Sequence, residues 1–279
     1  MNIVVTGATS GIGLAIVRAL VKRGDQVIAL GRNEKSCKKA YDLVSKQELS
    51  NLTYLACDLG VQKDIQEVGE KINTLLKEKG LDVLINNAGV VSKNRILTED
   101  KIELGFAVNH LAPFLLTHLL LPLLRKNKGK VITTGSKSHY KSKLDFDDLM
   151  LEKKYFILRA YGRSKLCNAL FTYEFNRRYA ADEMIAYCLD PGMVKTGIGD
   201  KRTNPFIAWA WKTYTRKGQT PEDVAPHYLE LIDEPKHLDE PYYYKHGKFI
   251  EPAEYAKRED VAKKLWSISL EMTKTYKLL

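Results

Sequence analysis

Short apolar segments alternate with longer segments of helical periodicity along the first two-thirds of the chain. The apolar segments have the length of buried strands. Six strands are expected, at Asn2–Thr6, Gln26–Leu30, Thr53–Cys57, Asp82–Ile85, Lys130–Thr134 and Met184–Leu189. Between the first two, Ile12–Lys22 carries apolar residues at helical spacing. Because strands that alternate with helices form right-handed βαβ units, the pattern predicts an α/β fold with a doubly wound parallel sheet in a three-layer α/β/α arrangement.

No linker, internal repeat or low-complexity tract interrupts this pattern, so residues 1–279 are interpreted as a single domain. The rhythm changes after the sixth predicted strand, where aromatic residues precede a helix expected after Pro221 and then recur at Tyr242–Tyr244. Ligands of a doubly wound sheet bind beyond the carboxyl ends of its strands. Residues 196–220 are therefore expected to be a lid-like insertion over the substrate. Packing of the same aromatic side chains against the core is the alternative.

The charge of the chain raises the question of a nucleic-acid partner, because 44 basic residues against 34 acidic ones give a formal net charge of +10. The basic residues are spread along the chain and form no stripe or recognition motif. This distribution favours a solvated, lysine-rich surface over nucleic-acid binding.

Cysteine usage and hydropathy bear on the compartment. The four cysteines are far apart and form no CxxC pair, so neither a disulfide framework nor a metal site is expected and a reducing cytoplasm fits best. The first predicted strand begins at Asn2, which leaves no room for a leader. The most apolar stretch, Leu111–Leu124, is too short to span a bilayer. We therefore expect a soluble, cytoplasmic protein without a membrane span.

A glycine-rich motif joins the first predicted strand to the first predicted helix. Glycine allows a tight turn and close approach of a pyrophosphate, which backbone N–H groups and the positive helix terminus then hold. Glycines also end strands for structural reasons, but the strand–turn–helix context favours dinucleotide binding in a Rossmann fold. The candidate cofactor residues are Gly7, Thr9, Ser10, Gly11, Ile12 and Gly13.

The ends of the second and third predicted strands bear on the adenosine half of such a cofactor. An NAD site places a carboxylate about 20 residues after the glycine motif, where this chain has Gly31 followed by Arg32. A guanidinium can pair with the 2′-phosphate of NADP, so NADP(H) is favoured over NAD(H); a surface arginine is the alternative. Asp58, followed by Leu59, could accept a hydrogen bond from adenine or cap the next helix.

Tyr161 and Lys165 carry the candidate chemistry. Their i, i+4 spacing places a phenol and an ammonium on one face of a predicted helix. A free tyrosine has a pKa of about 10, and a nearby positive charge would lower it toward the working range. A carbonyl reductase needs such a group to protonate the alkoxide while hydride arrives from nicotinamide. The spacing alone also fits an amphipathic surface pair.

Further motifs follow in the order Thr6–Gly13, Asn86–Gly89, Asn109, Ser136, Tyr161 with Lys165, and Pro191–Gly192. Over about residues 2–196 this set of motifs resembles the short-chain dehydrogenase/reductase family. The spacing between Ser136 and Tyr161 is longer than in many family members and resembles that of the branch that holds retinol dehydrogenases and protochlorophyllide reductases.

The resemblance implies a role for each catalytic candidate. Tyr161 would be the acid/base, and Lys165 would contact the nicotinamide ribose while lowering the tyrosine pKa. Ser136, preferred over its neighbour Ser138, would hold the substrate oxygen, and Asn109 would hold a water that links the lysine to solvent. The residues expected to line the rest of the cofactor are Asn87, Ala88, Gly89, Pro191, Gly192, Val194 and Thr196.

The implied activity is NADP(H)-dependent hydride transfer between nicotinamide and a carbonyl or alcohol, with a lipophilic aldehyde or ketone as substrate. The alternative is a catalytically silent NADP-binding sensor or scaffold. Relatives often dimerise through the helices that carry Asn109 and Tyr161, so a homo-oligomer is an open expectation. The sequence does not identify the substrate.

Overall fold

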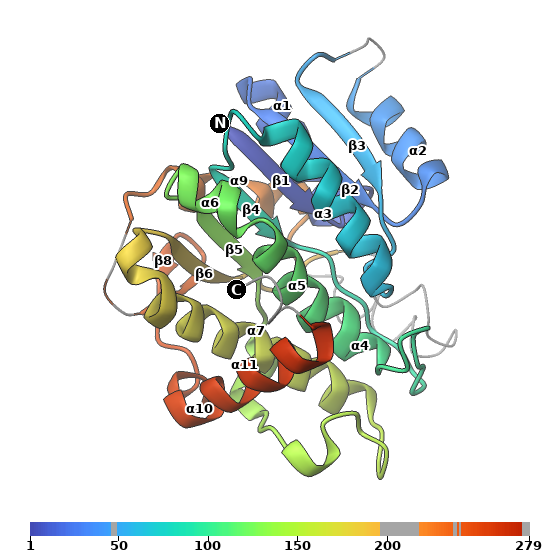
Figure 1. The fold of residues 1–279 in the computed structure, drawn as a ribbon, viewed down its shortest axis with the longest axis vertical. Helices are drawn as coiled ribbons and strands as arrows, with labels where there is room; N and C mark the ends of the chain where they lie inside the picture. Colours follow the sequence, from blue (N-terminus) through green and yellow to red (C-terminus); the bar gives the residue numbers. More distant parts are fainter. Residues whose placement is uncertain (46–48, 196–217, 237–238, 240, 275–279) are drawn as a thin grey trace.

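The structure is a computed structural model that describes residues 1–45, 49–195, 218–236, 239 and 241–274. Within them, an eight-stranded sheet runs through the molecule in the order β3-β2-β1-β4-β5-β6-β7-β8 (Figure 1). Neighbouring strands are parallel except β7 and β8, which are antiparallel. The chain starts at the centre of the sheet and winds outward first in one direction and then in the other, as a doubly wound fold requires.

All six predicted strands are confirmed, with boundaries that differ by at most one residue. They are β1 Asn2–Thr6, β2 Gln26–Gly31, β3 Leu52–Ala56, β4 Val83–Asn86, β5 Lys130–Thr134 and β6 Ile185–Asp190. These strands could be predicted because a central parallel strand is buried on both faces, so that its sequence is a continuous run of apolar residues. Every residue of β4, β5 and β6 is buried.

Two further strands, β7 Tyr243–Lys245 and β8 Lys248–Phe249, were not predicted. The sequence pattern groups Tyr243 and Tyr244 with the aromatic residues that follow the sixth predicted strand. In the structure they extend the sheet beside β6, and their side chains enter the apolar clusters on opposite faces. Strands of three and two residues are too short to show an alternating pattern.

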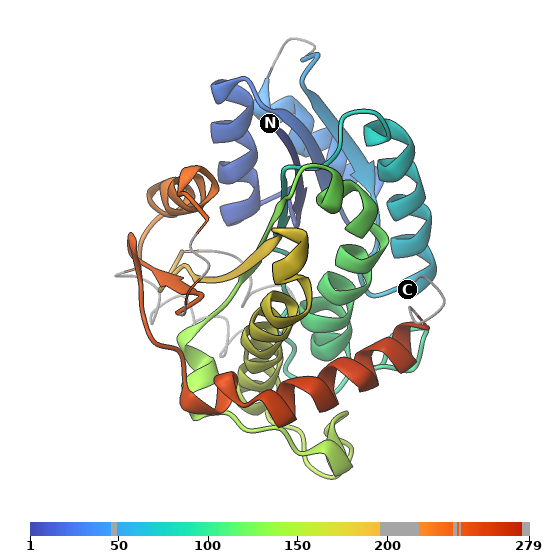
Figure 2. The same ribbon diagram turned by 60° about the vertical axis from the view of Figure 1, so that its left-hand side comes forward.

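Helices cover both faces of the sheet, as expected for three layers (Figures 1 and 2). One face packs against α1 Gly11–Arg23, α2 Glu34–Val44 and α9 Pro221–Asp233. The other packs against α3 Gln62–Leu76, α5 Ala112–Leu119, α6 Leu121–Lys126 and α7 Ile157–Tyr179. Shorter helices are α4 Leu104–Phe106, a π-helix at Ala107–Leu111, 3₁₀ helices at Lys137–Lys141, Phe146–Asp148 and Ala180–Asp182, and α10 Glu254–Lys257.

The C-terminal helix α11, Glu259–Thr273, lies across α5 and α7 on their outer side (Figures 1 and 2). Trp266 stacks on Phe171 with ring centroids 5.7 Å apart and meets Phe114 edge-on at 5.0 Å. As a result, α7 is buried around its whole circumference from residue 162 to residue 176. The α11 helix therefore covers part of the helix faces through which a homo-oligomer was expected, and the homo-oligomer stays a prediction.

Most of the expected lid, residues 196–220, lies outside the described residues, as does Thr196. Backbone hydrogen bonds join Met193 and Lys195 to Gln219, a described residue near the end of this range. The Gln219 N–H donates to the Met193 carbonyl at 2.8 Å, and the Lys195 N–H donates to the Gln219 carbonyl at 2.9 Å. All four cysteines are buried and unpaired. No helix among the described residues combines the length and apolarity needed to cross a bilayer.

Candidate active site

The glycine motif folds tightly against the end of β4. Gly7 and Gly11 have positive φ angles, +65° and +55°. A Cβ added at Gly13 would lie 2.3 Å from the Gly7 carbonyl oxygen and 2.6 Å from Asn87 Nδ2, so the turn has no space for a side chain. Asn87 Nδ2 donates to the Thr6 carbonyl at 3.0 Å. The two motifs, distant in sequence, therefore form one surface at the carboxyl ends of β1 and β4.

The N-terminus of α1 is suited to an anion. The helix begins after Ser10 without a side-chain cap, whereas α2 carries a capping box built by Asn33 and Ser36. The first N–H groups of a helix lack partners inside the helix and carry the positive end of its dipole. The glycine turn and α1 can thus hold a pyrophosphate.

Gly31 and Arg32 lie at the end of β2, next to this turn. A Cβ at Gly31 would be 2.3 Å from Thr9 Cγ2 and 2.6 Å from Cys37 Sγ. A carboxylate side chain at this position would therefore collide with the motif itself. Arg32 is exposed, and no ion pair with another described residue is seen for it.

Asp58 and Leu59 follow β3. Asp58 Oδ1 accepts a hydrogen bond from the Gly60 N–H at 2.9 Å. The N-cap of α3 is Val61, so the alternative in which Asp58 caps that helix is wrong. Leu59 packs its partly buried side chain against the core. Contact of Asp58 with adenine stays a prediction.

Tyr161 and Lys165 share one face of α7, as their spacing predicted. Lys165 Nζ lies 5.6 Å from the centroid of the Tyr161 ring and donates to the Thr134 carbonyl at 2.8 Å. The Ser136 side chain interacts with the Tyr161 phenol and acts to lower its pKa. A phenol and a hydroxyl therefore converge next to a buried cation at the carboxyl end of β5.

Burial dominates the protonation of both groups. It raises the pKa of Tyr161 to about 12, although the interaction with the Ser136 side chain acts in the opposite direction. It lowers the pKa of Lys165 to about 8, against Cys188 and Asp190, which raise it. The expectation that Lys165 brings the tyrosine pKa below its usual value is therefore wrong for this structure, because burial of the phenol outweighs the effect of the neighbouring charge.

Ser136 and Ser138 lie side by side, with their Oγ atoms 3.0 Å apart. Ser136 is the serine whose side chain acts on the Tyr161 pKa, and its preference over Ser138 as the substrate-binding serine stays a prediction. The structure also explains the glycine at position 135, because a Cβ there would lie 2.7 Å from Cys188 Sγ and 3.2 Å from the Tyr243 ring. The space beneath the Ser136 turn is thus already filled.

Asn109 lies in the π-helix Ala107–Leu111, a feature that often marks functional sites. Its side chain is buried and bonds both backbone groups of Val90, accepting from N–H at 2.7 Å and donating to C=O at 3.0 Å. It also donates to Ser164 Oγ at 3.0 Å, and that hydroxyl donates to the Tyr161 carbonyl at 2.8 Å. Asn109 therefore connects the π-helix to the backbone of the catalytic helix; its contact with a water stays a prediction.

Sequence reasoning missed a buried ion pair behind these residues. Arg163 Nη2 lies 2.5 Å from Glu103 Oε2, with side chains 3% and 0% exposed. The Glu103 carboxylate also accepts from the N–H groups of Gly105 and Phe106, both at 2.8 Å. The pair ties α4, which leads into the π-helix of Asn109, to α7. A local pattern could not reveal it because the partners are 60 residues apart.

His139 was also missed, although it lies three residues after Ser136. Its partners fix the tautomer: Nδ1 donates to the Ser136 carbonyl at 2.7 Å, and Nε2 accepts from the Ala253 N–H at 3.0 Å. The ring is buried and lies against the rings of Tyr140 and Tyr243, at centroid distances of 4.1 and 4.7 Å. The serine turn is thereby tied to a segment near the C-terminus.

The lowered pKa values of three buried histidines lead us to expect that the free energy of unfolding falls in acid. Burial lowers the pKa of His139, that of His118 to about 4 and that of His110 to about 3. The unfolded chain takes up these protons near pH 6.5 and the folded chain only at lower pH. The stabilisation is therefore present above about pH 6.5 and declines as the pH falls toward the folded values, by about 1.4 kcal/mol per pH unit per histidine.

Urea denaturation between pH 7 and pH 5 tests this prediction. The free energy of unfolding should fall over that interval, and His118→Leu should reduce the slope. A free energy that stays constant or rises as the pH falls would contradict it.

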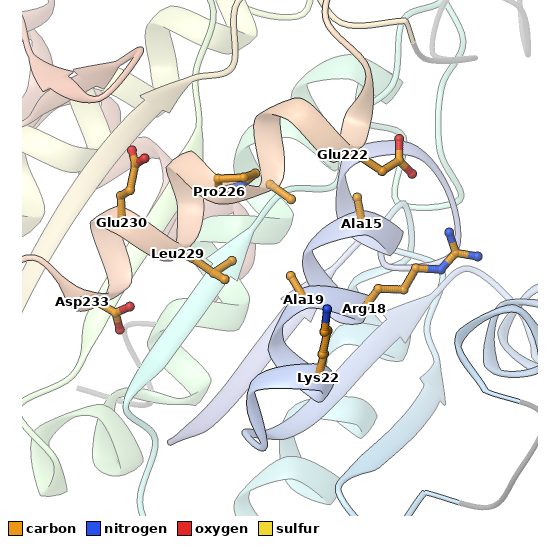
Figure 3. A pocket seen from close by; sticks show the side chains of 10 residues that line it. Ala15, Arg18, Ala19, Lys22, Glu222, Pro226, Leu229, Glu230 and Asp233 are labelled. Atoms are coloured by element: carbon orange, nitrogen blue, oxygen red, sulfur yellow. The ribbon is translucent and has the colours of Figure 1, made fainter.

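A concavity between α1 and α9 has a volume of about 510 Å³ and an apolar floor that includes Ala15, Ala19 and Leu229 (Figure 3). Its rim carries Arg18 and Lys22 from α1 opposite Glu222, Glu230 and Asp233 from α9. None of the catalytic candidates lines this groove.

Comparison with known proteins decides the family. A family model described as short chain dehydrogenase matches residues 1–205. The chain belongs to the short-chain dehydrogenases. Human polyprenol dehydrogenase is 32% identical over 294 residues, covering 97% of this chain and 84% of the relative. Human retinol dehydrogenase 13 is also 32% identical, over 291 residues, with the same two coverages.

A solved structure agrees with this placement. The NADPH-bound carbonyl reductase from chicken fatty liver has a TM-score of 0.69 and 25% sequence identity, covering 89% of this chain and 98% of that one. This short-chain dehydrogenase, which belongs to the retinol dehydrogenase-like branch, is therefore a hydride-transferring oxidoreductase with a nicotinamide cofactor and a small-molecule substrate.

Proposed function

We propose that this short-chain dehydrogenase uses NADP(H) to interconvert a lipophilic aldehyde or ketone and its alcohol, with Tyr161 as the acid/base. The observation that carries the proposal is the position of the Tyr161 phenol, which interacts with the Ser136 side chain and lies beside the buried ammonium of Lys165. Two O–H groups that converge on one oxygen can stabilise the charge that develops there during carbonyl reduction.

The residues at the carboxyl ends of the strands fit a dinucleotide. Gly7–Gly13 and the N-terminus of α1 would hold the pyrophosphate, and Asn87–Gly89 with Pro191–Gly192 would line the nicotinamide half. Gly13 supports this fit because its lack of a side chain keeps the turn closed against Asn87. When bound, NADPH supplies the hydride.

In reduction, the Tyr161 phenol donates its proton to the substrate oxygen as negative charge forms on it. A pKa of about 12 keeps this phenol protonated at neutral pH, which is the state a proton donor needs. Ser136 donates a hydrogen bond to the same oxygen and orients the carbonyl. Lys165 stabilises the phenolate that remains, because its ammonium lies next to the ring.

The preference for NADP(H) is supported by Gly31 and Arg32. Position 31, where an NAD site has its carboxylate, holds a glycine, and a Cβ there would lie 2.3 Å from Thr9 Cγ2. The exposed Arg32 guanidinium is available for a 2′-phosphate. The preference for a lipophilic substrate is supported by similarity to a polyprenol dehydrogenase and a retinol dehydrogenase.

Steady-state kinetics with a panel of apolar and polar carbonyl compounds tests the proposal. We expect turnover of the apolar compounds with NADPH and a lower kcat/KM with NADH. Arg32→Ala should lower kcat/KM for NADPH at least tenfold, equivalent to about 1.4 kcal/mol, and leave NADH within about twofold because NADH lacks the 2′-phosphate that Arg32 pairs with.

Lys35→Ala, which removes a neighbouring exposed cation on α2, is the matched control. It should lower kcat/KM for NADPH by less than Arg32→Ala does. A wild-type enzyme that favours NADH would overturn the cofactor assignment. Turnover limited to small, strongly polar carbonyls would overturn the substrate class. Cofactor binding without hydride transfer to any compound would indicate a sensor instead.

A further inference from the structure

The carboxyl ends of β6 and β7 carry an ion pair that takes no direct part in the proposed reaction. Asp190, the last residue of β6, is 2% exposed and pairs in register with Lys245, the last residue of β7. Lys245 Nζ lies 3.3 Å from Asp190 Oδ2. The other carboxylate oxygen, Oδ1, accepts from the Gly192 N–H at 2.8 Å. The Asp190 carboxylate thus contacts both β7, through Lys245, and the Pro191–Gly192 turn that follows β6.

The Pro191–Gly192 turn also touches the β7–β8 hairpin directly. Gly192 has a φ of +73°, and a Cβ there would lie 2.9 Å from Cε1 of His246. His246 and Gly247 form the hairpin turn, with φ angles of +48° and +77°. The left-handed conformation of these two residues places the hairpin turn close to the Gly192 backbone. A shift of the hairpin turn would therefore move the Pro191–Gly192 turn as well.

We propose that Asp190 and Lys245 are positioning residues that fix the Pro191–Gly192 turn where it meets the nicotinamide end of the cofactor. The inference rests on the proposed NADP(H) function, which places that turn at the nicotinamide. Lys245 neutralises Asp190 across the strand pair, and Asp190 in turn orients the Gly192 N–H. Removal of Lys245 leaves a buried carboxylate without its counter-ion, and such a group is stabilised by moving toward water. The Gly192 N–H would follow it.

Binding measured with two ligands tests the inference on the intact enzyme. NADPH contains the nicotinamide, whereas adenosine 2′,5′-bisphosphate contains only the adenosine half and its phosphates. Fluorescence titration of Lys245→Met should show about tenfold weaker binding of NADPH, about 1.4 kcal/mol. The bisphosphate should bind within about twofold of wild type. In turnover, KM for NADPH should rise by more than kcat falls.

The double variant Asp190→Asn/Lys245→Met provides the rescue. Its amide oxygen still accepts from Gly192, and no charge remains buried, so NADPH affinity should return to within about threefold of wild type. Lys245→Arg keeps the charge and should also bind NADPH nearly normally. Lys263→Met removes the cation of an exposed pair with Glu259 on α11 and should change neither affinity.

Three outcomes would overturn the inference. These are unchanged NADPH binding in Lys245→Met, an equal loss for the bisphosphate, and no recovery in the double variant. If Lys245→Met does not fold, Asp190→Asn alone should weaken NADPH about threefold while the bisphosphate is unaffected, and equal affinities would again overturn it. A wild-type protein that binds neither ligand would instead refute the proposed function.

Discussion

Tyr161→Phe is expected to lower kcat/KM for carbonyl reduction about a thousandfold, within the range that a positioned proton donor contributes. The ring remains, so its packing on α7 and its contact with Lys165 at 5.6 Å are retained. The hydroxyl that reaches Ser136 is lost. NADPH affinity should change little because the phenol acts on the substrate oxygen. Steady-state kinetics combined with cofactor titration separate the two effects.

Tyr155→Phe is the matched control for this variant. Tyr155 lies shortly before the start of α7, and its hydroxyl donates to the Ser92 carbonyl at 2.9 Å. Its removal costs one hydrogen bond, about 1 kcal/mol of stability, and should leave kcat within about twofold. A Tyr161→Phe enzyme with undiminished turnover would refute the acid/base role.

Glu103→Gln is expected to destabilise the fold by about 3 kcal/mol, because it leaves the Arg163 guanidinium buried without its counter-ion. The amide oxygen can still accept from Gly105 or Phe106, so the loss arises mainly from the charge. Arg163→Met should cost a comparable amount, since it leaves the Glu103 carboxylate buried. Urea denaturation measures both, and kcat should fall as well because the pair joins the π-helix of Asn109 to the helix of Tyr161.

The double variant Glu103→Gln/Arg163→Met separates charge from packing. It should be less destabilised than the sum of the single variants, by roughly 1–3 kcal/mol, the coupling typical of groups in direct contact. Lys63→Met, which removes an exposed cation that lies 3.9 Å from Glu67 on α3, should change stability by less than about 0.5 kcal/mol. Additive effects of the two buried substitutions would contradict the importance of the pair.

The parts of the site that were predicted share a local cause. Gly7, Gly11 and Gly13 mark the turn because the backbone conformation and spacing there are set within a few residues. Tyr161 and Lys165 meet because helix geometry alone places i and i+4 on one face. The first six strands were found because burial on both faces requires continuous apolar runs.

The parts that were missed depend on contacts between distant segments. His139 accepts a hydrogen bond from Ala253, which lies 114 residues away in the sequence. No local sequence pattern at either residue indicates that they pair. Strand β7 forms because Tyr243–Lys245 pairs with the edge of β6. A segment of three residues is too short for its sequence to predict this pairing. The direction of the tyrosine pKa was misjudged because helical spacing reveals a neighbouring charge but not the burial that outweighs it.

The sequence by itself determined the doubly wound sheet, the dinucleotide turn and the tyrosine–lysine pair, because each follows from periodicity or from backbone freedom over a few residues. Only the tertiary structure decided the Glu103–Arg163 and Asp190–Lys245 ion pairs and the covering of α7 by α11. These features depend on which surfaces meet after folding. Burial then sets the energy of every charge that is enclosed there.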